Sequence, residues 1–287
     1  MVAGILIALV ATVGVALTQL PGVGAGALLH PGRRAMTGPT PAGCLDEMFE
    51  GAGVRLEGWR CRTMAPRRGT LVYLHGVADN RAGAAGVVQR FGVKGFDVVA
   101  YDSRAHGHSG GDACTYGFYE KRDVARVLDT LPQGPVVLVG TSLGAAVALL
   151  TAALEARVSA VVAAETFSDL RTVAAERAPF VIKVGSFGRA LRLAERQGAF
   201  VVNDVSPVTA APAITAPVFL AHGDADTDTP SAHSRRVFAA LTSVKHLELV
   251  PGAGHNGALQ PHVWDRIERW LDGVVPRPVP SFMVPAP

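Results

Sequence analysis

The sequence has few charged residues and no run of basic ones. Charged residues make up 18% of its 287 residues, the formal net charge is +3, and the Arg-Arg pairs at 33–34 and 67–68 are isolated. Proteins that bind nucleic acid carry a clustered basic face, so we predict that nucleic acid is not a partner. Because 49% of the residues are hydrophobic, the chain does not belong to the disordered class, and its length allows a large domain with a substantial core.

Cysteine is also scarce. Cys44, Cys61 and Cys114 form no CxxC pair and no His/Cys cluster with the spacing of zinc ligands. Because Gly-x-Gly-x-x-Gly and Walker motifs are missing too, we expect no metal and no cofactor. An odd number of cysteines cannot pair completely within one chain. Cys44 and Cys61 can form a bridge in an oxidising compartment, but we expect each cysteine to be a reduced, buried thiol.

One long apolar run stands at the N-terminus. Residues 2–20 contain no charged side chain, and as a helix they would span roughly 28 Å, close to the thickness of a bilayer's hydrocarbon core. We therefore expect residues 1–30 to be a single-pass membrane anchor. The alternative is secretion after signal cleavage: the Ala-Gly-Ala sequence at 25–27 resembles a cleavage site, but no basic residue precedes the run. Arg33 and Arg34 weakly favour a cytoplasmic domain, and the side of the membrane stays open.

The rest of the chain alternates between strand and helix patterns. The expected strands are 70–74, 97–101, 136–139, 158–163, 218–220 and 246–250, after an antiparallel start at 47–63; the expected helices are 82–93, 119–131, 145–154, 231–241 and 263–271. This alternation is typical of a mostly parallel sheet covered on both faces. We therefore predict an α/β fold with a doubly wound sheet of about eight strands.

Composition sets the expected domain limits. The Pro- and Gly-rich residues 31–46 are predicted to be a linker, and the Pro-rich residues 274–287 a tail that forms no regular element. The domain between them spans 47–273. Within it, residues 167–213 lack a clear strand, and we expect them to form a small helical lid between the sixth and seventh strands.

The five-residue motif Gly140-Thr141-Ser142-Leu143-Gly144 carries the chemistry. The apolar, β-branched residues 136–139 before it are typical of a buried parallel strand, and the residues after it are good helix formers. A sharp Gly-x-Ser-x-Gly turn between a strand and a helix holds a serine hydroxyl out as a nucleophile. The glycines avoid Cβ clashes where strand and helix nearly touch. We therefore predict that Ser142 is a nucleophile.

A serine hydroxyl is a weak nucleophile that needs a base and an orienting carboxylate. In a sheet of this type, reacting groups gather at the carboxyl ends of the strands. Two late strands run into loops that supply an acid and then a histidine, the order that follows such a serine. Asp224, Asp226 and Asp228 follow the strand at 218–220, and His255 follows the last strand.

These motifs together resemble those of the α/β-hydrolase superfamily. They are Gly-Thr-Ser-Leu-Gly at 140–144, Leu-His-Gly at 74–76, Tyr-Asp-Ser-Arg-Ala-His-Gly-His-Ser-Gly-Gly at 101–111, His-Gly-Asp-Ala-Asp at 222–226 and Gly-Ala-Gly-His at 252–255. The resemblance covers about residues 48–273. It is closest to the small-lidded serine hydrolases described as serine-aminopeptidase-like or monoacylglycerol-lipase-like, some of which carry an N-terminal membrane anchor.

The resemblance implies a role for each site residue. Ser142 would be the nucleophile, His255 the general base and Asp226 the orienting acid. Asp226 is preferred to the two neighbouring aspartates because the family places this acid three residues after the motif's glycine, here Gly223. Glu165, just after the preceding strand, is an alternative acid position used in some relatives.

The resemblance also implies an oxyanion hole made of the backbone N–H groups of Leu143 and Val77. The N–H of Leu143 would lie at the N-terminus of a helix, where the helix dipole adds to its effect. Val77 follows the Leu-His-Gly motif. His75, His106 and His108 belong to the same group of motifs, and we expect them to be part of the scaffold rather than catalytic.

The resulting expectation is a serine hydrolase that acts on a small-molecule acyl substrate, such as a lipid-like ester or thioester. Peptidase or aminopeptidase-like activity, acyl transfer by the same triad and a catalytically silent binding module are the alternatives. Six aromatic residues could line an acyl pocket under the lid, although each is more typical of an ordinary core: Phe118, Tyr119, Phe167, Phe180, Phe187 and Phe200. The sequence leaves the substrate and the oligomeric state open.

Overall fold

A computed structural model describes residues 18–275 of the chain. Most of the predicted anchor at 2–20 and of the predicted tail at 274–287 lies outside these residues. Within them, eight strands form one sheet in the order β1-β2-β4-β3-β5-β6-β7-β8. The strands are β1 (Cys44–Glu50), β2 (Arg55–Cys61), β3 (Gly69–Leu74), β4 (Phe96–Tyr101), β5 (Val136–Thr141), β6 (Val158–Ala164), β7 (Val218–Gly223) and β8 (Lys245–Val250).

The six neighbouring strands β4-β3-β5-β6-β7-β8 run parallel to one another. The hairpin β1–β2 is antiparallel and forms one edge of the sheet. The predicted α/β class and strand number are therefore confirmed. Strand β5 shows why its sequence is continuously apolar: Val136 and Leu138 pack on one face of the sheet, and Val137 and Val139 pack on the other. A strand buried on both faces has no polar positions to alternate with.

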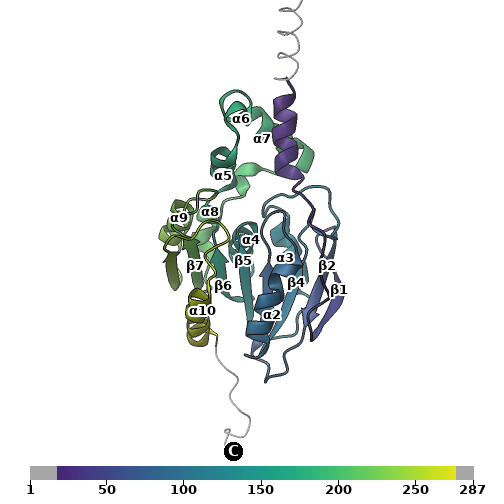
Figure 1. The fold of residues 1–287 in the computed structure, drawn as a ribbon, viewed down its shortest axis with the longest axis vertical. Coiled ribbons are helices and arrows are strands. Elements are labelled where there is room, and N and C mark those ends of the chain that lie inside the picture. Colours follow the sequence, from purple (N-terminus) through teal and green to yellow (C-terminus); the bar gives the residue numbers. More distant parts are fainter. Residues whose placement is uncertain (1–17, 276–287) are drawn as a thin grey trace, which may run out of the picture.

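Helices cover both faces of the sheet (Figure 1). The helices outside the lid are α2 (Ala85–Gly92), α3 (Glu120–Leu128), α4 (Leu143–Ala152), α9 (Ala232–Ala240) and α10 (Pro261–Val274). The apolar sides of α2 and α10 join one core cluster, and those of α3, α4 and α9 join the other. Every residue of α4 is buried, which explains why its sequence is apolar on all sides.

The insertion between β6 and β7 is helical. It contains α5 (Leu170–Arg177), α6 (Phe180–Gly185), α7 (Phe187–Gly198) and α8 (Pro207–Ala210), with short 3-10 turns at Val202–Asp204 and Ala211–Ala213. Helices α5, α6 and α7 lie beyond the strands, at one end of the molecule, whereas α8 lies beside α9 (Figure 1). A third apolar cluster joins the insertion to α4, through residues that include Phe167, Leu170 and Leu191.

The N-terminal segment packs against this insertion. Residues 18–29 form a helix, in which Ala25 and Leu29 are fully buried in the third cluster. Its last turn is tied to the domain, because the N–H of Cys114 donates to the carbonyl of Leu29 (2.8 Å). None of the helices between residues 18 and 275 is both long enough and apolar enough to cross a membrane.

Residues 30–43 form neither helix nor strand, and the first strand begins at Cys44, before the expected end of the linker. This segment is nevertheless attached to the domain. The guanidinium of Arg33 donates to the carbonyls of Ser109 and Gly111 (2.6 Å each), and Arg34 forms an ion pair with Asp79 (3.1 Å). The composition signals irregular structure here, but it does not reveal that the segment is held in place.

A disulfide joins Cys44 to Cys61, so the prediction of reduced thiols is wrong for these two residues. Their spacing in the sequence carried no signal, whereas the antiparallel register of β1 and β2 places them directly opposite each other, with 3.9 Å between their Cα atoms. Cys114 is a free, buried cysteine, as predicted. Burial raises the pKa of its thiol well above the ordinary value, which keeps it protonated and unreactive.

Candidate active site

The backbone turns sharply at Ser142, between the end of β5 and the start of α4. Ser142 has φ +49° and ψ −110°, a conformation that L-residues rarely adopt and that is typical of a strained functional turn. Both glycines of the motif are required by close backbone contacts. A Cβ on Gly140 would lie 2.2 Å from the carbonyl oxygen of Gly144, and a Cβ on Gly144 would lie 2.0 Å from that of Leu74.

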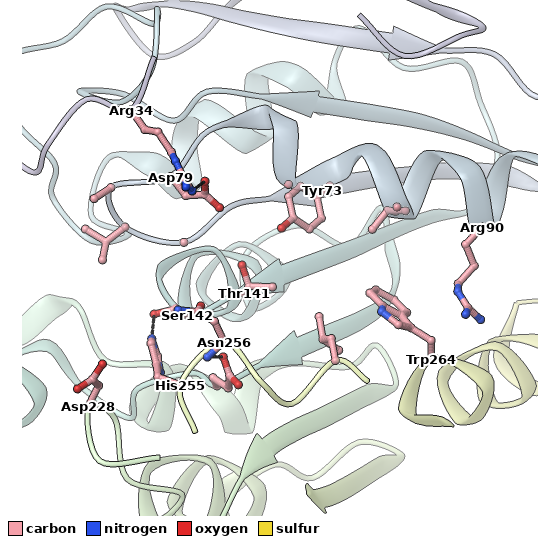
Figure 2. Close-up of a pocket in the computed structure, with 18 of the residues that line it drawn as sticks. Arg34, Tyr73, Asp79, Arg90, Thr141, Ser142, Asp228, His255, Asn256 and Trp264 are labelled. Carbon is pink, nitrogen blue, oxygen red and sulfur yellow. Dashed lines mark hydrogen bonds and ion pairs between the residues drawn. The ribbon is translucent and has the colours of Figure 1, made fainter. Parts of the chain in front are cut away.

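The structure brings Ser142, His255 and Asp226 together in one chain of hydrogen bonds. The Oγ of Ser142 lies 3.0 Å from Nε2 of His255, and Nδ1 of His255 lies 2.7 Å from Oδ2 of Asp226. Figure 2 shows the contact between Ser142 and His255. Since the Nδ1–H must donate to the carboxylate, Nε2 is free to accept the serine proton. The arrangement is that of a nucleophile, a base and an orienting acid.

Asp226 is held ionised by its surroundings. Burial alone would raise the pKa of its carboxyl group, but the N–H of Thr229 and the ring of His255 donate hydrogen bonds to it and lower the pKa below the ordinary value. Its Oδ1 accepts from the N–H groups of Asp228 and Thr229 (2.9 Å each), while Oδ2 faces His255. The carboxylate is therefore charged and fixed in the orientation that the histidine needs.

The other candidate acids have different contacts. Glu165 does not contact the ring of His255; its two oxygens accept from the backbone N–H groups of Asn256 (2.6 Å) and Ala258 (2.8 Å), and so brace the loop that carries the histidine. Asp224 accepts from the N–H of Gly252 (2.7 Å) on the same loop. These two acids position the histidine loop rather than the histidine itself.

The predicted oxyanion donors lie next to Ser142. Val77 and Leu143 both line the space around the serine, and a Cβ on Gly76 would lie 3.6 Å from the Cβ of Ser142. Neither N–H group donates a hydrogen bond to another atom of residues 18–275. Both are therefore available to a ligand, and the N–H of Leu143 opens helix α4, where the helix dipole favours negative charge.

His75 is a buried structural residue, as predicted. Its Nε2 accepts from the N–H of Ser103 (2.9 Å), so its Nδ1 carries the proton and donates to the carbonyl of Gly76 (2.7 Å). This bond holds the peptide group that supplies the N–H of Val77. Burial, aided by the neighbouring His106, lowers the pKa of His75 to about 4.

The two later histidines also belong to the scaffold. His106 is fully buried, and its Nδ1 contacts the carbonyl of Arg104 (2.9 Å). The backbone N–H of His108 donates to Asp102 (2.9 Å), a buried carboxylate that also forms an ion pair with Arg81 (2.6 Å). These contacts hold the loop after β4 beside the site.

Arg177, the last residue of α5, is a site residue that no sequence signal marked. Its Nη2 lies 3.3 Å from Nε2 of His255 and also donates to the hydroxyl of Thr229 (2.6 Å). Its Nε donates to the carbonyl of Asp228 (2.8 Å). An arginine in a helix far from the other motifs looks like solvated surface charge in the sequence, and only the fold places it at the histidine.

Ser142 lies between two cavities of opposite character. One is a polar groove of about 1130 Å³, shown in Figure 2, where the labelled Arg34, Asp79 and Arg90 lie around it. The other is an apolar cavity of about 340 Å³ between α4, the lid and the helix at 18–29. Val77 and Arg177 line both spaces as well. A substrate at the serine can thus place an apolar part on one side and a polar part on the other.

The aromatic candidates separate into distinct environments. Phe167 and Phe187 line the apolar cavity. Phe118 packs edge-to-face against Tyr119 and Phe200; these three do not line it. Phe180 is 78% exposed.

Within residues 18–275, no three His, Cys, Asp or Glu side chains are grouped as metal ligands.

Comparison with known families agrees with this geometry. The chain matches the family described as "alpha/beta hydrolase fold" over residues 69–184. It also matches the "Prolyl oligopeptidase family" over residues 130–275, and this second match covers about half of the chain. The chain belongs to the α/β-hydrolase superfamily. The finer resemblance to serine-aminopeptidase-like or monoacylglycerol-lipase-like hydrolases stays a prediction.

The individual relatives are distant. The uncharacterized protein YqkD of Bacillus subtilis is 29% identical over 65% of this chain and 64% of its own length, so the match spans less than two thirds of that relative. YfhR of Escherichia coli K12 is 27% identical over 71% of this chain and 70% of its own.

Solved structures share the fold. An esterase from Pyrococcus furiosus superposes with a TM-score of 0.71 at 23% identity, covering 86% of this chain and 99% of the esterase. Acetyl xylan esterase 1 from Thermoanaerobacterium sp. JW/SL YS485 gives a TM-score of 0.64 at 18% identity, covering 90% and 93%. The acylaminoacyl peptidase of Pyrococcus horikoshii gives 0.64 at 14% identity, with 84% of this chain but only 43% of the peptidase covered.

The buried histidines of this α/β-hydrolase predict a loss of stability in mild acid. Burial lowers the pKa of His75, His106, His222 and His233. Between the ordinary histidine pKa of about 6.5 and about 4, the unfolded chain binds protons that the native chain does not, so the free energy of unfolding falls as pH falls. His75 alone contributes on the order of 3 kcal/mol to this loss.

Urea unfolding between pH 7 and pH 4 measures the effect. We expect His75→Gln, which keeps a donor and an acceptor, to weaken the dependence of the free energy of unfolding on pH. The matched control is His262→Gln, at an exposed position in α10, which should leave it unchanged. Equal pH dependence in all three proteins would contradict the prediction.

Proposed function

We propose that the protein is a serine hydrolase that cleaves a carboxylic ester, or a related acyl bond such as a thioester, through an acyl-enzyme on Ser142. The observation that carries this proposal is the continuous hydrogen-bonded chain from Ser142 through His255 to Asp226. It lies where two unpartnered N–H groups and an apolar cavity meet. In such a site a serine becomes nucleophilic because the base accepts its proton as the bond forms.

The reaction follows from this geometry. His255 Nε2 takes the proton of Ser142 as Oγ attacks the acyl carbon, and the carbonyl oxygen becomes an oxyanion held by the N–H groups of Val77 and Leu143. His255 then gives the proton to the leaving oxygen or sulfur, which departs and leaves the acyl-enzyme. A water molecule gives a proton to Nε2 and attacks the acyl carbon; collapse of the second oxyanion returns the proton to Ser142 and releases the acid. Each oxyanion donor contributes about 10²- to 10³-fold in such reactions.

The two cavities support an acyl group with an apolar chain. The acyl chain would occupy the apolar cavity, lined by residues such as Phe167 and Leu170, and the leaving group would occupy the polar groove. Peptidase activity is the second candidate, favoured by the match to the prolyl oligopeptidase family over residues 130–275. Acyl transfer would use the same acyl-enzyme, whereas a silent binding module would not need a complete triad.

Labelling with a fluorophosphonate probe tests the nucleophile. Because only an activated serine attacks this phosphorus centre, we expect the wild-type protein to be labelled and Ser142→Ala to be unlabelled, with ester turnover reduced by roughly 10⁴-fold or more. The matched control is Ser159→Ala, on strand β6, which should label like the wild type. A folded wild-type protein that is not labelled would contradict the proposal.

The two buried acids near the histidine should respond differently to removal of their charge. Asp226→Asn leaves the imidazole without its charged partner and should lower kcat by about 10⁴-fold. Glu165→Gln loosens only the loop of His255 and should lower kcat by at most about 10²-fold, the scale of a positioning defect. Steady-state hydrolysis of a soluble ester measures both. If Glu165→Gln is the more damaging change, the acid is wrongly assigned.

We also propose that residues 2–20 anchor the protein in a membrane, with the catalytic domain on the oxidising side. The disulfide between Cys44 and Cys61 supports this side, because such bonds persist mainly outside the cytoplasm. Arg33 and Arg34 favoured the cytoplasm in the sequence, but their side chains bind carbonyl groups and a carboxylate of the domain. They are therefore weak evidence for topology.

Thiol counting in isolated membranes tests this location. Cells are lysed with a maleimide reagent present, and the protein is then denatured in more reagent without a reductant. We expect one of the three cysteines, Cys114, to be modified without reduction and all three after reduction. In a Cys114→Ser control, no thiol should react before reduction. Three reactive thiols without a reductant would place the domain in a reducing compartment.

A further inference from the structure

Large apolar side chains are exposed together at the lid end of the molecule. On α6, Phe180 is 78%, Val181 61% and Val184 71% exposed, and Val23 on the N-terminal helix is 59% exposed. The two helices are neighbours here, since a Cβ on Gly24 would lie 3.5 Å from the side chain of Ile182. Figure 1 shows them side by side beyond the sheet. Exposed apolar residues are normally scattered, and a group of them marks an interaction surface.

Basic side chains accompany this apolar group. Lys183, Arg189, Arg192 and Arg196 are all exposed on α6 and α7, and none of them forms an ion pair within the part of the chain that the structure describes. The single carboxylate of the two helices, Glu195, accepts from the N–H of Val202 (3.0 Å). Exposed apolar residues on a helix that carries Lys183, followed directly by a helix with three exposed arginines, match an interfacial surface that inserts between lipids and attracts anionic headgroups.

The apolar cavity extends from this surface to the nucleophile. Its inner end is lined by Ser142 and Leu143, and one wall is formed by the N-terminal helix, through Val23, Gly24, Ala27 and Leu28. Val23 both lines the cavity and is mostly exposed. The outer end of the cavity therefore lies at the apolar surface. An acyl chain bound at Ser142 would extend along this wall toward that surface.

The residues that precede the N-terminal helix indicate what covers the exposed apolar surface. The helix that bears Val23 begins, in the described residues, at Thr18, and residues 2–17 before it contain no charged side chain. With residues 18–20 they form the uncharged run 2–20, which is long enough as a helix to cross the hydrocarbon core of a bilayer. The same bilayer can then cover the exposed residues of α6 beside it. A water-soluble protein partner would leave the apolar stretch unexplained.

We propose that the lid end, made of α6 and the helix at 18–29, docks on an anionic lipid bilayer, and that the apolar cavity receives the acyl chain of an ester held in that bilayer. The acyl part rests on the serine hydrolase function proposed above; the docking part does not. Because the cavity opens toward the bilayer, its small volume does not limit chain length, and the end of a long chain can stay among the lipids.

A fluorescent label on the docking surface tests the first part without any activity. The full chain with Val184→Cys, labelled with an environment-sensitive fluorophore, is reconstituted into vesicles of phosphatidylcholine and phosphatidylglycerol. The matched control is Val93→Cys, which is equally exposed (77%) just after α2, away from the lid. We expect a blue shift and quenching by brominated acyl chains at 184 but not at 93. Equal access of aqueous iodide to both labels would overturn the docking proposal.

Turnover of two esters tests the second part. Phe180→Glu with Val184→Glu should lower hydrolysis of a long-chain ester embedded in the vesicles by about tenfold or more, equivalent to about 1.4 kcal/mol. Hydrolysis of a soluble acetyl ester should change less than about twofold, because neither residue lines the cavity. Val93→Glu should affect neither ester. Equal losses on both esters would overturn the proposal that the cavity receives the acyl chain from the bilayer. A wild-type protein that hydrolyses neither ester would refute the hydrolase function, and the docking proposal would then be tested by the fluorescent label alone.

Discussion

The contact between helix α4 and the end of strand β3 determines the geometry of the whole site. Gly144 approaches the carbonyl of Leu74 so closely that any side chain would collide with it. This approach places the N-terminus of α4 against the end of β3, directly after Ser142 with its positive φ. This contact thus positions the nucleophile and one proposed oxyanion donor, while the hydrogen bond from His75 to the carbonyl of Gly76 holds the peptide group that supplies the other.

Three carboxylates then place the histidine, each through a different contact. Asp226 holds the ring of His255 directly, while Glu165 and Asp224 hold the backbone of its loop at three N–H groups. Because each acid has its own contact with the histidine or its loop, these three carboxylates after β6 and β7 all have a role at the site. Buried carboxylates are stable when they accept several hydrogen bonds, and N–H groups of the loops provide them. Only Asp226 keeps an oxygen for the histidine.

The parts of this structure that follow from local sequence were predictable. The continuous apolar run of β5 and the glycines around Ser142 are short-range signals, and they identified the sheet and the elbow. Arg177 and the pairing of Cys44 with Cys61 depend on which elements meet in three dimensions, and the sequence carried no signal for either. The acid was an intermediate case: the residues after β7 offered three aspartates, and only the family resemblance, through the spacing from Gly223, selected Asp226.

The N-terminal helix links the location of the protein to its cavity. If residues 25–27 were a cleavage site, removal of the preceding residues would delete Val23 and Gly24 from the cavity wall and expose Ile182 and Ala190, which pack against Gly24. Ala25 is also fully buried in the apolar cluster that joins the lid to α4. We therefore infer that this segment is retained, as the proposed anchor requires. On that proposal, the anchor continues into the helix that forms one wall of the apolar cavity.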